Sequence, residues 1–172
     1  LELHFLPIQV RKDIALTGII GKPKLGWNIN ELIKTIETFL GWNNNKKALL
    51  AGVGSLGEAI LKYKGFKESG LEIIVAFDKD KNKIGKEIGG IKILDIADMQ
   101  KLIKRMKIKI GIITVPASSA QAIAKLMEEA GISAIWNFAP ATLKLSKKTI
   151  ILYETMVSSL AVLSKKIELA QN

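Results

Sequence analysis

The sequence predicts an α/β fold, a Rossmann-like parallel sheet with helices on both faces. Three observations lead to this prediction. A short apolar run turns through glycines at 48–57, apolar β-branched runs then alternate with amphipathic segments, and an acidic residue ends the second of those runs. Strands that alternate with helices form parallel sheets that are covered on both faces.

The residues ahead of this sheet predict a small basic module. Pro7–Leu16 is expected to be a short helix with Ile8, Val10 and Ile14 facing inward, since proline suits the first helical turn. The stretch 19–27 predicts two short β-like pieces around a Gly-Lys-Pro-Lys turn. A basic helix followed by a basic hairpin is typical of the recognition helix and wing of a winged helix-turn-helix.

A connecting helix and a polar linker are expected next. Asn28 or Asn30 can cap a helix that runs to about Leu40, with an apolar face at Leu32, Ile33, Ile36, Phe39 and Leu40. The polar stretch 41–47 predicts the domain boundary. We therefore expect a DNA-binding module with its connecting helix at 1–45, a nucleotide domain at 46–152, and a C-terminal helix at 153–172.

The nucleotide domain is predicted from alternating segments. The expected strands are 48–51, 71–78, 91–94, 108–115 and 134–136, and the expected helices are 56–63, 96–107 and 118–130. The last segment has helical spacing at Met156, Leu160, Leu163, Ile167 and Ala170. Such a helix could pack on its own sheet or on a second subunit, and periodicity does not choose between them.

The glycine-rich turn predicts a dinucleotide site. Gly52 permits a tight turn, Gly54 lets the backbone approach a pyrophosphate, and Gly57 lets the helix pack close to the strand. The ligand would meet free amides at the helix start. Asp78 lies about 20 residues further on, where a carboxylate accepts hydrogen bonds from the adenosine ribose and favours NAD over its 2′-phosphorylated form.

Two other strand ends are candidates for the rest of the ligand. Thr114-Val-Pro-Ala117 and Asn137-Phe-Ala-Pro140 each place small or polar residues beside a proline-stiffened turn. Ligands of such sheets bind outside the carboxyl ends of the strands. Either segment could instead be an ordinary strand-to-helix turn.

Composition narrows the class of protein. The net charge of +10 predicts attraction to polyanions such as nucleic acid, although enrichment in lysine also fits a thermophilic or AT-rich source. The absence of cysteine excludes disulfides, thiolate metal sites and thiol redox chemistry. No signal peptide or apolar run of membrane-spanning length is evident, so we expect a cytoplasmic protein with no membrane partner and no metal.

With these residues in hand, the chain resembles the Rex family of bacterial redox-sensing transcriptional repressors. The shared motifs run in one register from about Gln9 to Leu163. They are Gln9-Val-Arg-Lys-Asp13, Gly18, Gly21-Lys22, Gly26-Trp-Asn28, Gly52-Val-Gly54, Leu56-Gly57, Tyr63-x-Gly65-Phe66, Ala76-Phe-Asp78, Lys83-Ile-Gly85, Ile88-Gly-Gly90, Thr114-Val-Pro-Ala117 and Asn137-Phe-Ala-Pro140. Many short motifs in the family's order are far more specific than any one of them.

The resemblance implies an N-terminal winged helix, a domain that binds NADH or NAD, and a C-terminal helix swapped between the subunits of a homodimer. Such repressors hold operator DNA when NADH is scarce and release it when NADH binds. The implied cofactor-binding residues are Gly52, Val53, Gly54, Ser55, Leu56, Gly57, Asp78, Lys83, Thr114, Val115, Pro116, Asn137, Phe138, Ala139, Pro140 and Met156 of the partner subunit. The implied DNA contacts are Gln9, Arg11, Lys12, Lys22 and Lys24.

An apolar site can distinguish the two redox states of the cofactor. NAD carries a positive charge on its nicotinamide ring, whereas NADH does not. Burying a cation without a partner is costly, so a site lined by Val115, Pro116, Phe138, Ala139 and Met156 of the partner subunit should prefer the neutral ring.

The sequence departs from the family pattern in three places. The family's first two winged-helix helices have no counterpart here, so we expect only the recognition helix and wing. Ser55 replaces the usual asparagine, and Thr155-Met156 replace an aspartate and a large apolar residue at the start of the last helix. In the family that aspartate reaches across the dimer toward the tyrosine that matches Tyr63, and threonine cannot carry its charge.

Two alternatives come from other classes. An NAD-dependent oxidoreductase usually needs a general acid and a substrate domain, but the single histidine, His4, lies outside the nucleotide domain, and we predict no catalytic residues. A CoA-binding domain of the acyl-CoA ligase type shares the glycine-loop sheet. Asp78 and the basic N-terminal segment speak against that alternative.

Overall fold

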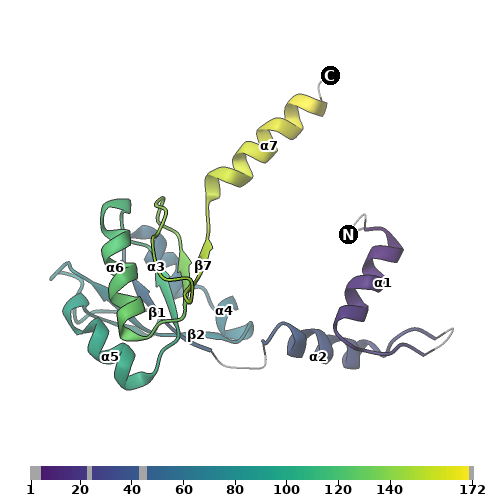
Figure 1. Cartoon of the computed structure of the whole chain (residues 1–172), viewed down its shortest axis with the longest axis horizontal. Coiled ribbons are helices and arrows are strands. Elements are labelled where there is room, and N and C mark those ends of the chain that lie inside the picture. Colours follow the sequence, from purple (N-terminus) through teal and green to yellow (C-terminus); the bar gives the residue numbers. More distant parts are fainter. Residues whose placement is uncertain (1–4, 23–24, 43–45, 171–172) are drawn as a thin grey trace.

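The computed structural model describes residues 5–22, 25–42 and 46–170, and its centre is a seven-stranded sheet (Figure 1). The strands are β1 (Lys46–Ala51), β2 (Leu71–Asp78), β3 (Glu87–Ile88), β4 (Ile91–Asp95), β5 (Ile110–Ile113), β6 (Ala134–Asn137) and β7 (Ile150–Tyr153). Their spatial order is β3-β4-β2-β1-β5-β6-β7, and every pair except β3 with β4 is parallel. Without β3, this is the doubly wound order of dinucleotide-binding folds. The predicted fold class is confirmed.

The sheet is buried because successive strand residues face opposite layers. In β1, Leu49 and Ala51 belong to a core shared with α5 (Met99–Met106) and α6 (Ala117–Ala130). Ala48 and Leu50 face a second core that includes α3 (Ser55–Lys62). This alternation follows the two-residue period of a strand.

Several elements differ from those expected. The short helix α4 (Gly65–Glu68), strands β3 and β7, and a 3₁₀ turn at Ile96–Asp98 were not predicted. Tyr153, expected to begin the last helix, ends β7 instead. The crossover from β6 to β7 spans residues 138–149 and contains no helix, although a parallel connection usually does.

The N-terminal module contains two helices beside the sheet. α1 (Pro7–Leu16) has the predicted bounds, and α2 (Ile29–Phe39) is capped by Asn28, whose side chain accepts a hydrogen bond from the Glu31 amide (3.1 Å). The expected hairpin is present as a single antiparallel bridge between Lys22 and Gly26 rather than as two strands. Figure 1 shows both helices standing away from the faces of the sheet.

The expected inner face of α1 is only partly confirmed. Ile14 is half-buried, but Ile8 and Val10 are exposed, so the prediction that they face inward is wrong for the described residues. In α2, Leu32 and Ile36 are half-buried, whereas Ile33, Phe39 and Leu40 are exposed. The reason is that no described layer packs against these side chains. The exposed apolar surface is large for a small module.

The last helix, α7 (Met156–Ala170), leaves the sheet after β7 as a separate rod (Figure 1). The large apolar side chains described on it are exposed: Val157, Leu160, Val162, Leu163, Ile167 and Leu169. None of the helices in the described ranges has both the length and the apolar character needed to cross a bilayer.

Candidate nucleotide-binding site

The glycine-rich turn joins β1 to α3 at the carboxyl edge of the sheet. Gly52 has a φ of +98°, a left-handed conformation that favours glycine. A Cβ on Gly52 would lie 2.7 Å from the Val115 Cγ1 and 2.8 Å from the Thr114 carbonyl carbon, and a Cβ on Gly57 would collide with the Gly52 carbonyl oxygen. Both glycines are therefore required by the fold itself.

Gly54 is different because its backbone is extended and a Cβ there would meet no protein atom within 4 Å. It caps α3 without a side-chain hydrogen bond to the helix. The first amides of a helix have no intrahelical acceptor, so those of Ser55, Leu56 and Gly57 can donate to an anion. The turn thus fits a pyrophosphate, and Gly54 is the glycine that the fold does not need.

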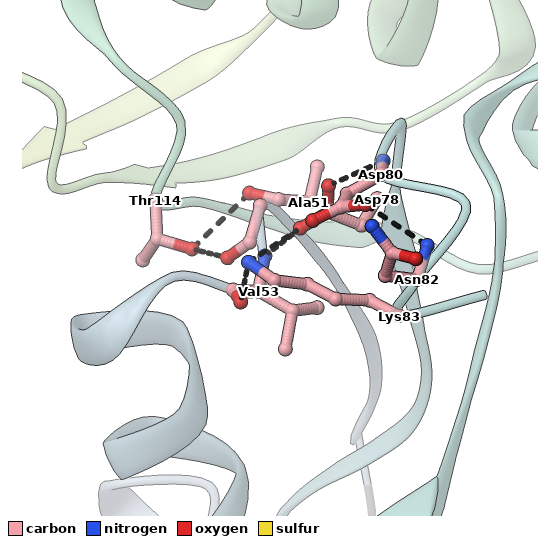
Figure 2. A network of polar contacts seen from close by, with 8 residues as sticks. Ala51, Val53, Asp78, Asp80, Asn82, Lys83 and Thr114 are labelled. Carbon is pink, nitrogen blue, oxygen red and sulfur yellow. Dashed lines mark hydrogen bonds and ion pairs between the residues drawn. The ribbon is translucent and has the colours of Figure 1, made fainter. Parts of the chain in front are cut away.

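Asp78 ends β2 and is tied to the glycine-rich turn (Figure 2). Its Oδ2 accepts a hydrogen bond from the Val53 amide (2.7 Å), and its Oδ1 accepts one from the Asp80 amide (3.0 Å). Each carboxylate oxygen has two lone pairs, so Asp78 retains acceptors for ribose hydroxyls. The structure therefore brings the predicted ribose residue next to the predicted pyrophosphate loop.

Two opposing effects set the ionisation of Asp78. Burial raises the pKa of its carboxyl group, but hydrogen bonds from the Asp80 and Val53 amides and the charge of Lys83 together outweigh burial. The pKa of Asp78 therefore lies below its ordinary value, and the side chain is an anion at neutral pH.

Lys83 supports the same turn from the segment that follows β2. Its Nζ donates a hydrogen bond to the Val53 carbonyl oxygen (2.8 Å) and lies 3.8 Å from the Asp78 Oδ2 (Figure 2). The backbone amide of Val53 is thus held by Asp78 and its backbone carbonyl by Lys83. In this structure Lys83 braces the loop.

The two proline turns lie side by side on neighbouring strands. Thr114 follows β5. Its Oγ1 lies within hydrogen-bond distance of two carbonyl oxygens, those of Ala51 (3.1 Å) and Gly52 (2.6 Å), to which the hydroxyl can donate. Asn137 ends β6 in register with Ile113, and the Phe138 amide donates to the Ile113 carbonyl (2.9 Å). The structure brings Thr114–Pro116 and Asn137–Pro140 together beside the glycine-rich turn. This agrees with the expectation that the carboxyl ends of neighbouring parallel strands lie at one edge of the sheet.

Asn137 is the one buried polar residue among the described side chains. Its Nδ2 donates to the Ala139 (3.1 Å) and Ala141 (3.0 Å) carbonyls, and its Oδ1 accepts from the Ala139 amide (3.1 Å). The side chain therefore shapes its own turn and offers little to a ligand.

Aromatic side chains extend from this turn across the α3 side of the sheet. Phe138 packs on Trp136 (4.8 Å between ring centroids), Trp136 on Phe66 (5.6 Å), and Phe66 on Tyr63 (4.8 Å). Tyr63, at the end of this series, is 61% exposed. A groove of about 920 Å³ lies beside Tyr63 and Phe66, away from the strand ends, so the candidate site is an open edge and not that groove.

Other predicted residues are not at this edge. Gln9, Arg11 and Lys12 are exposed on α1, and Lys22 is exposed at the bridge. Met156 begins α7, and its side chain is not among those described; His4 and Lys24 lie outside the described residues. No group of three or more His, Cys, Asp and Glu side chains able to hold a metal occurs in the described part of the chain.

A set of side chains that no sequence pattern predicts holds the 138–149 crossover. Gln121 and Glu128 on α6 and Tyr153 on β7 bond to its backbone or hydroxyl groups. These partners are 10 to 23 residues apart in the chain, beyond the range of any local pattern.

The chain is similar to known proteins over most of its length. Residues 43–141 match the model of the CoA binding domain family. A redox-sensing transcriptional repressor Rex from Treponema denticola is 48% identical over 162 residues, which are 94% of this chain and 77% of that protein. A protein of the same name from Chloroflexus aurantiacus is 39% identical over 152 residues, 88% of this chain and 72% of that protein.

Solved structures of a repressor named RSP are also similar. The crystal structure of RSP with beta-NAD+ and operator DNA matches with a TM-score of 0.87 and 32% identity, covering 95% of this chain and 75% of that chain. The structure of RSP with beta-NADH matches with a TM-score of 0.85 and 32% identity, covering 95% and 76%. The fold of 95% of this chain is therefore found in experimental structures.

Proposed function

Because the chain belongs to the Rex family of redox-sensing transcriptional repressors, with residues 43–141 in the CoA binding domain family, we propose that it is an NADH-responsive repressor. It binds operator DNA as a homodimer in the cytoplasm and is released when NADH binds. The observation that carries this proposal is the glycine-rich turn held by Asp78 and Lys83, beside two proline turns.

The cofactor lies across the carboxyl edge of the sheet in this proposal. The turn from Gly52 to Gly57 holds the pyrophosphate through the amides of Ser55, Leu56 and Gly57. The Val53 amide is bonded to Asp78 and therefore shapes the turn from within. Asp78 accepts the adenosine ribose hydroxyls, and Lys83 keeps the turn in place. The structures of RSP with NAD+ and with NADH support this choice of cofactor.

The proline turns form the nicotinamide end. Val115, Pro116 and Phe138 present an apolar surface, which Met156 of the partner subunit completes. Ala139 is buried in the core, so it supports this surface from behind and does not line it as expected. When bound, the cofactor supplies a ring that is charged in NAD and neutral in NADH. An apolar surface that excludes water stabilises the neutral ring relative to the charged one, because a buried cation without a partner is costly.

The exposed apolar surface of α7 supports a homodimer. Leu160, Leu163 and Ile167 lie on one face of this helix, and each is more than half exposed. Apolar side chains of β7, including Ile150 and Leu152, are also exposed. Contiguous exposed apolar surface marks an interaction site, so α7 packs on a second copy of the chain rather than on its own sheet.

The N-terminal module supplies the DNA contacts. α1 carries Gln9, Arg11 and Lys12 on its exposed surface, and the bridge carries Lys22. Cationic side chains of this kind contact phosphates and orient a recognition helix in the major groove. The RSP structure with operator DNA supports this assignment.

Neither alternative class is favoured. The relatives are named as transcriptional repressors and not as dehydrogenases. A CoA ligand is suggested by the domain family's description, but Asp78 suits ribose hydroxyls and would repel a phosphate placed on them. Competition of CoA against bound NADH separates the two ligands.

Elution of bound DNA tests the proposal. The protein is immobilised, exposed to a pool of random duplex DNA, washed, and eluted with NADH or with the same concentration of NAD. We expect NADH to elute retained duplexes and NAD to elute far fewer. Retention of no DNA, or equal elution by both nucleotides, would refute the proposed function.

A further inference from the structure

The 138–149 crossover joins the nicotinamide end of the site to the last strand without a helix to stiffen it. It leaves the carboxyl edge of β6 at Phe138 and returns to the amino end of β7. Twelve residues without regular structure would normally be mobile. Here the crossover is held by side chains from both sides.

Gln121 of α6 holds the crossover at Lys144. Its Oε1 accepts a hydrogen bond from the Lys144 amide (2.8 Å), and its Nε2 donates to the Lys144 carbonyl (3.0 Å). A single side chain thus satisfies both backbone groups of one loop residue. Glu128, seven residues further along the same face of α6, holds the far end through Ser146 and Thr149.

Tyr153 of β7 holds Leu143, the residue before Lys144. Its hydroxyl accepts a hydrogen bond from the Leu143 amide (3.0 Å) and lies 3.4 Å from the Leu143 carbonyl oxygen. Leu143 is buried in the core, so the crossover is fixed by packing as well as by polar contacts. Gln121 on α6 and Tyr153 on β7 therefore hydrogen-bond to adjacent crossover residues, Lys144 and Leu143, and we call these two contacts the grips.

α6 connects both halves of the nicotinamide end. The helix begins at Ala117, directly after Pro116, and one turn later it presents Gln121 to the crossover that begins at Phe138. We propose that Gln121 and Tyr153 are positioning residues for nicotinamide recognition, which set the place of Phe138–Pro140 relative to Val115–Pro116. The proposal rests on the proposed function, since it assigns a role within the same site.

The physical reason is the steep dependence of an apolar contact on distance. A gap of 0.5 to 1 Å already loses about a quarter to a half of a van der Waals contact. The Phe138–Pro140 turn keeps its internal bonds to Asn137, and the contacts at Leu143 and Lys144 fix the segment that follows it. Loss of either contact lets this turn shift as a unit, while the glycine-rich turn and Asp78 stay unchanged. The nicotinamide end of the cofactor should then be held less tightly, whereas the adenosine and pyrophosphate end should not.

The test compares NADH with ADP-ribose, which has the pyrophosphate and both riboses but no nicotinamide. Gln121→Ala and Tyr153→Phe remove the two grips. Lys125→Ala is the matched control, because Lys125 lies one turn beyond Gln121 on α6 and makes an exposed ion pair with Glu129 (4.0 Å), and it acts on Glu128 through its charge alone. Dissociation constants are measured by calorimetry, and thermal unfolding establishes that each variant is folded.

We expect each grip variant to weaken NADH binding about five- to tenfold, the factor that one hydrogen bond carries. ADP-ribose binding should change by less than about twofold, and Lys125→Ala should match the unchanged protein for both ligands. Equal losses for NADH and ADP-ribose, or no loss for NADH, would overturn the positioning role. An unchanged protein that binds no NADH would instead refute the proposed function, and this inference with it.

Discussion

The three glycines of the turn after β1 have different physical roles. Gly52 and Gly57 have no room for a side chain, because protein atoms occupy the space that a Cβ would need. At Gly54 that space contains no protein atom. The sequence pattern alone predicts a ligand loop, but only the structure separates the glycines that the fold requires from the one that the ligand requires.

Gly54→Ala should therefore mainly affect ligand binding, whereas Gly57→Ala should mainly affect folding stability. We expect Gly54→Ala to weaken NADH binding by about tenfold or more while lowering the free energy of unfolding by less than about 1 kcal/mol. Gly57→Ala should lower the free energy of unfolding by about 1–3 kcal/mol, since its Cβ meets the Gly52 carbonyl. Calorimetry and urea unfolding measure the two quantities. A Gly54→Ala protein that binds NADH normally would exclude close approach of the pyrophosphate.

Asp78 should make folding stability depend on pH at the acid end. Its pKa is lower in the folded chain than in the unfolded chain, so its stabilisation is fully present above the ordinary carboxyl pKa of about 4 and is lost as pH falls through the folded pKa. We expect the free energy of unfolding of the unchanged protein, minus that of Asp78→Asn, to be constant from pH 7 to 5 and to shrink below about pH 4. Urea unfolding across this range measures it, and a difference that grows on acidification would contradict the pKa shift.

Asp78 should also set the choice between NADH and NADPH. A carboxylate bonded to the Val53 amide repels a 2′-phosphate on the adenosine ribose. Asp78→Ala should weaken NADH binding. It should also lower the ratio of the NADPH dissociation constant to the NADH dissociation constant by about tenfold. The same titrations on Asp80→Ala are the control, because Asp80 bonds to Asp78 through its backbone amide, and its side chain accepts a local hydrogen bond from the Asn82 amide (2.9 Å). An unchanged NADH to NADPH ratio would remove Asp78 from the ribose site.

Among the elements, α7 should carry the dimer. Leu160→Glu places a charge within the apolar face that also contains Leu163 and Ile167. We therefore expect this substitution to convert dimers into monomers at micromolar concentration. Lys165→Glu, which changes the opposite face, should remain dimeric. Sedimentation equilibrium measures the mass. Monomers in the unchanged protein, or dimers in Leu160→Glu, would contradict the assignment of α7.

Strongly periodic elements could be predicted from the sequence, whereas elements defined by distant contacts could not. The strand ending at Asp78 agrees with the structure because its apolar run is a local signal, and the helix at Pro7–Leu16 agrees because its proline marks the first turn. β7 was missed, since Ile150–Tyr153 is too short to predict until Ile150 pairs with Ala134. The same limit applies to Lys83, whose contact with Val53 spans 30 residues.

At the scale of the whole molecule, one edge of the sheet connects the proposed nicotinamide end to the helix that we propose forms the dimer. The Glu154 amide donates a hydrogen bond to the Asn137 carbonyl (2.9 Å), so the turn proposed to hold the nicotinamide is bonded to the segment that leads into α7. A ligand shifts an equilibrium between two arrangements only by its difference in affinity for them. The response to redox state therefore depends on a difference in affinity between NADH and NAD.

That difference is the measurement that tests the account most directly. Calorimetric titration of one protein preparation with NADH and with NAD gives both dissociation constants under the same conditions. We predict that NADH binds about a hundredfold more tightly, a difference of roughly 2.8 kcal/mol. Equal dissociation constants for the two nucleotides would contradict the claim that an apolar nicotinamide end senses the charge of the ring.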